Sequence, residues 1–337
     1  MKVLVTGGTG FTGSHTVRAL AACGHEIRLL VRDADKARRV FEPHGFVPDG
    51  LVVGDMTDAS AVEGALRGCD GVLHAAALVD LRRAAARRVE ESNLRGVELV
   101  VGGAARRGLP AIVHVSSLGV FFVPGGPPLA VDLPIARGTT AYARSKAQAE
   151  VYVRRLQEDG APIRISYPAL VMGPDDPGMS AGNNAVYSFF KDIGLITSSG
   201  MQCVDVRDLA TVHARLLELP NGAHRYAAAG EMLRWDDVLS LLDRLTGRHI
   251  RRITVPGWLL RTAGSAGDVV KRIYDFDFPL TREAMEFTTR WPGADAGRTM
   301  KDLGLRFRDA EETYRDTVVW MYRAGYLTKS QVGRLAD

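Results

Sequence analysis

The stretch VLVTGGTGFTGSH, close to the start of the chain, places Gly7, Gly10 and Gly13 in a GxxGxxG spacing between an apolar strand pattern and a helical pattern. Glycine can adopt positive φ, lets a backbone approach a pyrophosphate, and allows a helix to pack closely on a strand. The helix N-terminus adds free N–H groups and the positive end of a dipole. A glycine motif alone is weak evidence. Because this one opens a long alternation of strands and helices, it predicts a dinucleotide site.

The alternation predicts the fold class. Short runs rich in Val, Ile and Leu are predicted as strands at residues 2–7, 26–32, 50–55, 71–77, 111–117 and 163–171. Helical patterns separate them, for example at residues 15–24, 60–68 and 91–108. Repeated alternation gives a parallel sheet with right-handed crossovers and helices on both faces. We therefore expect an α/β protein with a Rossmann-type doubly wound parallel sheet.

This rhythm breaks after about residue 172. The segment GPDDPGMSAGNN is loop-forming, and the later elements are mixed helices and short strands. Helices are predicted at residues 206–219, 234–247 and 310–325. We therefore expect a dinucleotide-binding domain at residues 1–172. A smaller mixed substrate-binding lobe should follow at residues 173–337, interleaved with the end of the sheet and closing over a site.

Composition limits the class of protein. The 337 residues are 46% apolar, which supports a real core, and 43 basic against 39 acidic residues give a net charge of +4. That charge is too mild for a nucleic-acid-binding protein. The sequence opens on an apolar strand without a basic leader, and no apolar run approaches the length of a membrane span. We expect a cytoplasmic protein with no integral membrane segment.

Neither cysteine nor histidine spacing suggests a metal site. Cys23, Cys69 and Cys203 are scattered without metal-ligand or redox spacing, which suits a reducing compartment. His74, His114 and His213 show no metal-like grouping and are interpreted as strand or helix residues. No metal is therefore predicted.

The end of the second predicted strand bears on the choice of cofactor. Dinucleotide folds place an Asp or Glu there to hold the ribose 2′-hydroxyl, or an arginine to accommodate a 2′-phosphate. Position 31 is valine, Arg32 follows at once, and Lys36 lies close behind with Arg38 and Arg39. Cations attract a phosphate through charge-assisted hydrogen bonds, so NADP(H) is favoured. Asp33 keeps NAD(H) as the alternative, because a one-residue shift in the loop could aim it at the ribose.

Further cofactor contacts are expected along the edge of the sheet. Asp55 and Met56 follow the third strand and would face the adenine, although an Asp that caps the next helix is the alternative. The small residues that finish the fourth strand leave room for the cofactor, and plain core alanines are the alternative for these. The remaining predicted contacts are Thr6, Phe11, Thr12, Ala75, Ala76 and Ala77.

Tyr142 and Lys146 are candidates for the chemistry. They lie four apart on a predicted helix, so an ammonium can sit near a phenol, favour its anion and lower its pKa from about 10. The fifth strand runs into Ser116 and Ser117, and a hydroxyl at the carboxyl end of a parallel strand points into the crevice where such sheets bind ligands. Turn serines are the alternative for this pair.

In combination these motifs resemble the extended short-chain dehydrogenase/reductase family, the NAD-dependent epimerase/dehydratase superfamily. The resemblance rests on TGGTGFTG, GDMTD, the serine pair, YARSK, and YPALVMGPDDP followed by CVDVRDLA, and it covers roughly residues 2–215. LLVRDADK resembles the dihydroflavonol-reductase-like, cinnamoyl-reductase-like and hydroxysteroid-dehydrogenase-like members. The last third resembles the family only loosely.

The resemblance implies roles for single residues. Tyr142 would be the acid/base, Lys146 would bind the nicotinamide ribose and lower the pKa of the tyrosine, and Ser117 would hydrogen-bond the reacting oxygen. Asn93 matches the asparagine that supports the site through a helix kink or a bound water, and a helix-interior polar residue is its alternative. The family's Arg-Pro is Tyr167 and Pro168 here, which alters contacts near the nicotinamide but keeps Pro168 and Val171 as cofactor contacts.

An NAD(P)-dependent enzyme that interconverts a carbonyl and an alcohol is the function these residues favour. Hydride would move between the nicotinamide and the carbonyl while Tyr142 transfers a proton and Ser117 stabilises the alkoxide. Nucleotide-sugar epimerisation or dehydration is the alternative enzyme activity, although it normally prefers NAD with an acidic residue at the second strand. A catalytically silent dinucleotide-binding protein is the alternative from another class.

Substrate and partners are less constrained. Residues 183–196 and 255–280 carry aromatic and aliphatic side chains, which suit a small apolar or aromatic substrate, and core packing explains many of them equally well. The amphipathic stretch from Trp258 to Tyr274 contains Arg261, Lys271 and Arg272. It is interpreted as a helix that covers the lobe, and contact with a membrane surface is the alternative. A homodimer is a weak expectation.

Overall fold

The computed structural model describes residues 1–80, 82–191, 193–220, 222–270, 274 and 281–336. Its centre is a parallel sheet, seven-stranded over these residues, in the order β10-β6-β5-β4-β1-β2-β3. The strands are β1 (Lys2–Thr6), β2 (Glu26–Val31), β3 (Gly50–Val53), β4 (Gly71–His74), β5 (Ala111–Val115), β6 (Ile163–Pro168) and β10 (His224–Ala228). The predicted doubly wound α/β sheet is confirmed.

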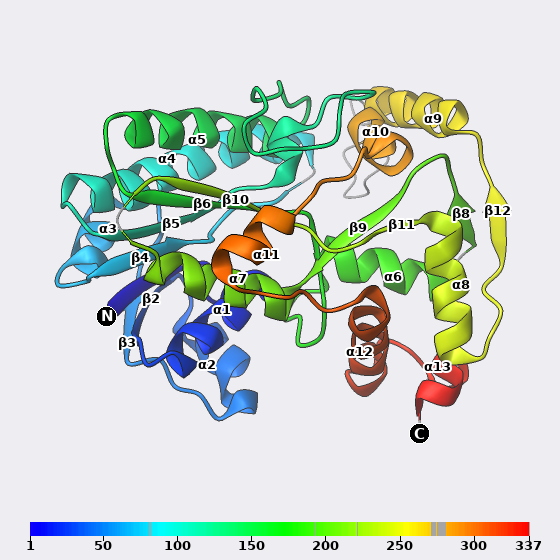
Figure 1. The fold of residues 1–337 in the computed structure, drawn as a ribbon, viewed down its shortest axis with the longest axis horizontal. Coiled ribbons are helices and arrows are strands. Elements are labelled where there is room, and N and C mark those ends of the chain that lie inside the picture. The colour runs from blue at the N-terminus through cyan, green and yellow to red at the C-terminus, as the bar shows by residue number, and fades with distance from the viewer. Residues whose placement is uncertain (81, 192, 221, 271–273, 275–280, 337) are drawn as a thin grey trace.

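Helices cover both faces of this sheet, as Figure 1 shows. One face carries α3 (Ala59–Leu66), α4 (Ala86–Arg106) and α5 (Ala141–Glu158), and Val62, Val97 and Val153 from these helices pack in one core with Ile112 of β5. The other face carries α1 (Phe11–Ala22), α2 (Ala34–Phe41) and α7 (Val206–Glu218). Because both faces are buried, the strands are continuous Val/Ile/Leu runs rather than alternating ones.

The sixth predicted strand is corrected by the structure. The run at residues 163–171 divides at Ala169, whose N–H bonds to the carbonyl oxygen of Ala228 at 2.8 Å. The piece after it, β7 (Leu170–Met172), leaves the central sheet and pairs with β9 (Gly200–Asp205). The nine residues IRISYPALV are predicted as one strand, although the first piece, IRISYP, is mixed and the second, LVM, is wholly apolar.

The second lobe is mixed, as expected. Strands β11 (Met232–Arg234), β9 and β7 form one small sheet, and β12 (Arg252–Thr254) pairs with β8 (Gly194–Ile196). Its core draws on Val186, Leu242, Val318 and Val332. Besides α7, the described α-helices that follow β7 in the chain are α6 (Ala181–Lys191), α8 (Trp235–Thr246), α9 (Gly257–Val270), α10 (Arg282–Arg290), α11 (Gly297–Leu303), α12 (Ala310–Arg323) and α13 (Lys329–Val332). The three helices predicted in this half are confirmed within two residues as α7, α8 and α12.

The chain returns from the lobe to the central sheet. Strand β10 pairs with β6 from His224↔Arg164 to Ala228↔Pro168, and α7 packs on the same sheet. The sequence analysis missed β10 because the five residues HRYAA carry neither a β-branched side chain nor an apolar alternation. The division of the chain at residue 172 stays a prediction.

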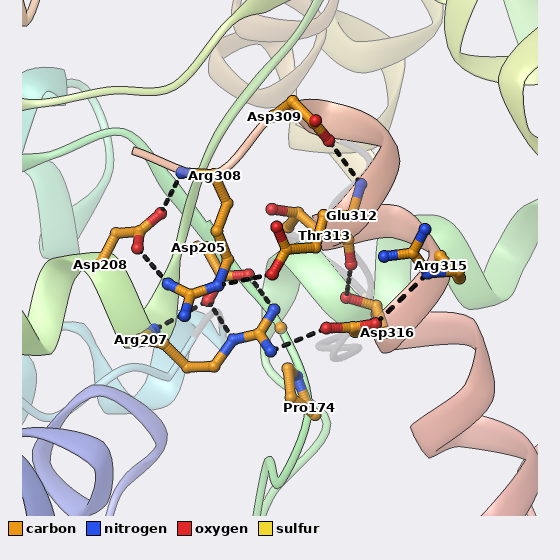
Figure 2. Close-up of polar contacts among 12 residues, drawn as sticks. Pro174, Asp205, Arg207, Asp208, Arg308, Asp309, Glu312, Thr313, Arg315 and Asp316 are labelled. Carbon is orange, nitrogen blue, oxygen red and sulfur yellow. Dashed lines mark hydrogen bonds and ion pairs between the residues drawn. The ribbon is translucent and has the colours of Figure 1, made fainter. Parts of the chain in front are cut away.

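An ion-pair network joins α12 of the lobe to α7 at the sheet (Figure 2). Arg207 donates to the Asp205 carboxylate through Nε at 2.9 Å and Nη2 at 2.7 Å. Its Nη1 donates to Asp316 of α12 at 2.7 Å. Arg308 pairs with Asp208 and donates its backbone N–H to the same carboxylate at 2.7 Å. Asp205 and Asp208 are buried, so their charges need these partners. The network fixes the lobe against the sheet.

Among the described helices, none combines the length and the apolar character needed to cross a membrane. In the stretch from Trp258 to Tyr274, Trp258 and Leu259 are exposed on α9, whereas Arg261 is engaged with Glu286 and Thr289. Lys271 and Arg272 lie outside the described residues. The membrane-surface interpretation stays untested.

Candidate active site

A cavity of about 710 Å³ opens between the carboxyl ends of the central strands and the second lobe. Parallel sheets bind ligands at this edge. The structure brings most of the predicted site residues to its wall, namely Gly7, Gly10, Phe11, Thr12, Gly13, Ala75, Ala77, Ser117, Tyr142, Lys146, Pro168 and Val171. The predicted residues outside this wall are Thr6, Arg32, Lys36, Asp55, Met56, Ala76 and Asn93.

The glycine loop is packed too tightly for any side chain. Gly7 has φ +75°, and a Cβ there would lie 2.6 Å from the backbone nitrogen of Ala76. A Cβ on Gly13 would lie 2.1 Å from the carbonyl oxygen of Gly7. Gly10 precedes α1, no side chain caps that helix, and its first turn carries no acid. The N–H groups at the start of α1 therefore face the cavity without a competing protein anion, which suits a pyrophosphate.

Thr6 and Ala76 support this loop from behind. Thr6 is buried at the end of β1, where its Oγ1 lies 2.7 Å from Nδ1 of His74. Burial lowers the pKa of His74 to about 3, so this ring stays neutral. His114 stacks on His74 with ring centroids 5.7 Å apart. Both histidines are core strand residues, as interpreted from the sequence.

The loop after β2 presents its cations to solvent. Arg32 and Lys36 are exposed, and neither pairs with an acid among the described residues. Asp33 is the N-cap of α2, where Oδ1 accepts the N–H groups of Asp35 and Lys36 at 2.8 and 3.0 Å. Backbone hydrogen bonds hold the pKa of Asp33 below its usual range. Its capping role explains why a carboxylate follows the arginine.

Asp55 is also engaged locally. Its Oδ1 accepts the N–H of Thr57 at 2.9 Å and the Thr57 hydroxyl at 2.7 Å, and Asp58 rather than Asp55 caps α3. The helix-cap alternative for Asp55 is therefore wrong. Met56 packs against α4, where a Cβ on Gly96 would lie 2.7 Å from its sulfur. Contact of either residue with an adenine stays a prediction.

Tyr142 and Lys146 lie on one face of α5, as their spacing predicts. The Lys146 nitrogen is 6.0 Å from the centre of the Tyr142 ring and donates to the carbonyl oxygen of Val115 at 3.0 Å. Burial lowers the pKa of Lys146 to about 8, and the Glu150 carboxylate opposes this shift.

The expected effect of this lysine on the tyrosine is corrected. We expected the Lys146 cation to lower the pKa of Tyr142, but burial raises that pKa to about 12. Desolvation outweighs the cation here because Lys146 is itself buried and directed at the Val115 carbonyl. The phenol therefore keeps its proton at neutral pH.

The two serines have different environments. The Ser117 oxygen accepts the N–H of Gly119 at 3.1 Å at the start of a 3₁₀ turn, Leu118–Phe121, and no described group accepts its hydroxyl proton. Ser117 lines the cavity, so its O–H is free to donate into it. The Ser116 hydroxyl instead donates to Glu150 at 2.8 Å inside the protein. Both serines line the cavity, and among the described residues only Ser117 lacks an acceptor for its hydroxyl proton; its role in the reaction stays a prediction.

Asn93 supports the site from outside the cavity. Its Oδ1 accepts the N–H of Leu78 at 2.7 Å, and its Nδ2 donates to the Leu78 carbonyl at 3.0 Å and to the Ser145 hydroxyl at 2.9 Å. These bonds tie the loop after β4 to α4 and α5. Asn93 therefore links these segments beside the Tyr142 helix, and its support of the reaction stays a prediction.

Tyr167, which stands in place of the family's arginine, lies in the core and not near the cavity. It is buried and donates to Oε1 of Glu150 at 2.5 Å. Arg154 supplies the missing cation, with Nε 2.7 Å from the same carboxylate oxygen. Tyr167 itself does not line the cavity, whereas its neighbour Pro168 does, and the expected change of contacts near the nicotinamide stays a prediction.

The lobe wall of the cavity differs from the predicted one. No described residue of 183–196 or 255–280 lines it, and residues 192, 271–273 and 275–280 lie outside the described residues. Tyr187, Phe189 and Phe190 pack in the lobe core instead. The apolar wall comes from Met201, Trp235, Phe287 and Trp291. These four residues share no sequence motif, and only the approach of β9, α8 and α10 reveals them.

Gln202 organises this wall. The Trp291 indole donates to its Oε1 at 3.1 Å, the N–H of Ala294 donates to the same oxygen at 2.9 Å, and its Nε2 donates to the carbonyls of Gly230 and Ala294. Phe287 stacks on Phe122 with ring centroids 4.2 Å apart.

Over the described residues, no three His, Cys, Asp or Glu side chains come together as a metal site would require.

Comparisons with known proteins agree with this architecture. Residues 3–228 match the model of the NAD dependent epimerase/dehydratase family. The chain is 26% identical to sterol demethylase protein B of Methylococcus capsulatus, over 97% of this chain and 100% of that protein. It is also 26% identical to cinnamoyl-CoA reductase 1 of Arabidopsis thaliana, over 96% of this chain and 90% of that one. The crystal structure of gox2253 superposes with a TM-score of 0.81 at 25% identity, covering 97% and 99% of the two chains.

The family match spans the glycine loop, the cavity serine and the Tyr142 helix, and the relatives extend the likeness through the lobe. The chain belongs to the NAD dependent epimerase/dehydratase family and is an NAD(P)-dependent enzyme of the short-chain dehydrogenase/reductase superfamily.

Proposed function

We propose that the protein is an NADP(H)-dependent oxidoreductase that interconverts a carbonyl and an alcohol on a small apolar or aromatic substrate. The observation that carries this proposal is the composition of one cavity: Ser117, Tyr142 and Lys146 on the sheet side, and apolar and aromatic side chains on the lobe side. The cofactor, when bound along the glycine loop, supplies or takes up a hydride.

The chain's own groups would handle the proton and the charge. Tyr142 is a half-buried phenol in the cavity wall, and desolvation raises its pKa to about 12, so it is protonated at neutral pH and suited to give a proton to a carbonyl oxygen that gains negative charge. The free O–H of Ser117 can donate a hydrogen bond to the same oxygen. Lys146 would hold the nicotinamide ribose.

Arg32 and Lys36 support the preference for NADP(H). Both are exposed cations after β2, whereas Asp33, the alternative ribose ligand, is occupied as the cap of α2. An unpaired guanidinium can bind a phosphate through two parallel hydrogen bonds. NAD(H) would gain nothing from these charges.

The lobe wall supports a substrate without a diphosphate. Lys146 and Glu283 are the only charged residues that line the described cavity. A nucleotide sugar needs cations for its phosphates, so this wall argues against the epimerase alternative. The names of two relatives, a sterol demethylase protein and a cinnamoyl-CoA reductase, point to apolar and aromatic groups in the substrates of those proteins.

The chemistry is tested by NADPH oxidation against a panel of aromatic, aliphatic and steroid carbonyls, with wild type and Tyr142→Phe. We expect the phenylalanine variant to bind NADPH as wild type does and to turn over about 10²–10⁴ times more slowly, the usual contribution of a general acid. Retained turnover would remove Tyr142 from the mechanism. Conversion of nucleotide sugars without net NADPH oxidation, followed by chromatography in a separate assay, would favour the epimerase alternative.

The cofactor preference is tested by fluorescence titration of Arg32→Ala with NADPH and NADH. We expect NADPH affinity to fall by about 1–3 kcal/mol, the range for a charged hydrogen bond, and NADH affinity to stay the same. Arg38→Ala is the matched control, because Arg38 lies on the same loop and helix but is paired with Asp35 at 2.6 Å. Equal losses for both cofactors would reject a 2′-phosphate role.

A further inference from the structure

Glu283, in the first turn of α10, reaches across the cavity to the segment that starts α5. Its carboxylate accepts the N–H groups of Thr139 and Thr140 at 2.7 and 2.9 Å. It also accepts the hydroxyls of both threonines, that of Thr140 at 2.8 Å. These contacts join residues more than 140 positions apart in the chain.

The segment held by Glu283 leads directly into the Tyr142 helix. Thr140 is the N-cap of α5, and its Oγ1 accepts the N–H of Ala143 at 3.2 Å. The Arg144 side chain donates from Nη1 to the Thr139 carbonyl oxygen at 2.6 Å. Tyr142 lies within this first turn, so the position of its phenol depends on where Thr139 and Thr140 are held.

The helix that carries Glu283 also carries the substrate wall. Phe287 lies four residues further on, on the same face of α10, and both side chains line the cavity. The lobe fixes α10 at its last turn, because the Trp235 indole and the Thr197 hydroxyl both donate to the Thr288 carbonyl. In Figure 1, α10 lies on the side of the lobe that faces the start of α5.

We propose that Glu283 is a positioning residue for the reaction, which sets Tyr142 relative to the aromatic wall by binding the start of α5 from the lobe. This inference rests on the proposed function. Only a carboxylate accepts from all four donors, since a glutamine that kept its oxygen on both N–H groups and on the Thr139 hydroxyl would turn its NH₂ group toward the Thr140 hydroxyl. The negative charge also lies at the N-terminus of α5, where the helix dipole favours it.

The contact itself is tested by amide hydrogen exchange on the intact protein. In Glu283→Ala, the amides of Thr139 and Thr140 lose their acceptor and should exchange at least about tenfold faster than in wild type. Glu311→Ala is the matched control, because Glu311 is also the second residue of its helix, is exposed, and accepts no hydrogen bond among the described residues. Unchanged exchange at both threonines in Glu283→Ala would overturn the proposal.

Kinetics then test the positioning role. A misplaced catalytic group costs rate rather than cofactor binding, so we expect kcat of Glu283→Ala to fall about 10- to 100-fold while NADPH affinity stays within twofold. Glu283→Gln should keep part of the rate, and Glu311→Ala all of it. A double-mutant cycle combines Glu283→Ala with Thr139→Val. Adding Thr139→Val to Glu283→Ala should lower kcat little further, because the contact is already lost.

The outcomes separate this inference from the proposed function. A kcat within twofold of wild type in Glu283→Ala, or a loss of NADPH affinity as large as the loss of kcat, would overturn the positioning role. Absence of turnover in wild type with every carbonyl would reject the proposed reaction, and with it a role for Glu283 in that reaction. The exchange rates would still decide whether Glu283 holds the start of α5.

Discussion

The two walls of the cavity are built by different means. The sheet-side wall consists of short motifs at the carboxyl ends of the strands and the first turn of α5, and the close approach of backbones fixes its glycine loop. The lobe-side wall consists of large side chains from β9, α8 and α10, whose positions depend on partners such as Gln202 and the Thr288 carbonyl. A backbone wall can be predicted from a motif, whereas a side-chain wall needs the packed structure.

The largest expected effect tests the backbone wall. In Gly13→Ala the new Cβ would lie 2.1 Å from the Gly7 carbonyl oxygen, so the glycine loop must move. We expect NADPH affinity, measured by fluorescence, to fall about 100-fold, or about 3 kcal/mol. Gly64→Ala is the control, since its Cβ would enter open space on α3 and should stabilise that helix by about 0.5–1 kcal/mol. Normal affinity in Gly13→Ala would show that backbone approach does not set this wall.

The burial of Lys146 gives the second effect, on stability against pH. Its pKa is about 8 in the folded chain and about 10.5 when unfolded, so between these values the unfolded chain binds a proton that the folded chain does not. The free energy of unfolding should therefore rise with pH in this window. Below pH 8 the full cost of the buried charge is present.

Lys146→Met removes this dependence. Denaturant unfolding from pH 7 to 10 should show wild type gaining about 2–3 kcal/mol relative to the variant. Above pH 10 Tyr142 acts in the opposite direction, because its pKa is raised to about 12 and the folded chain then holds the extra proton. A constant difference between wild type and variant across the range would mean that Lys146 is hydrated.

Gln202→Met tests the side-chain wall with a smaller effect. The change leaves the Trp291 indole and the Ala294 N–H without an acceptor, which should cost about 1–3 kcal/mol of stability in denaturant unfolding. Substrate KM should rise because Trp291 loses its anchor, while NADPH affinity stays within twofold. The exposed Gln148→Met on α5 should change neither. A fall in NADPH affinity alone would erase the distinction between the two walls.

The smallest effect concerns Asp33. Its removal in Asp33→Ala should slightly lower the free energy of unfolding through the lost cap of α2, as Asp58→Ala should through the lost cap of α3. Neither change should alter the ratio of NADH to NADPH affinity. If Asp33→Ala selectively weakened NADH, Asp33 would be a ribose ligand and the preference for NADP(H) would need revision.

Particular residues show how far the sequence leads. Gly7, Gly10 and Gly13 predict the loop, and a Cβ is sterically excluded at Gly7 and Gly13. Tyr142 and Lys146 predict a shared helix face because their spacing fixes it. The pKa of Tyr142 could not be predicted, since desolvation depends on how the folded chain surrounds the ring. The cavity role of Trp291 was also invisible, because Gln202, its partner, lies 89 residues away.

Strand β10 has a consequence for how relatives could be recombined. It covers the outer side of β6 along five paired residues, and the Thr299 hydroxyl of α11 secures the Ala227 carbonyl at 2.6 Å. In a chimera joined at residue 172, β10 would come from the other protein. If that strand did not pair with β6, β6 would be left as an open edge of the sheet. A graft that exchanges substrate preference should therefore carry residues 206–228 with the nucleotide-binding half.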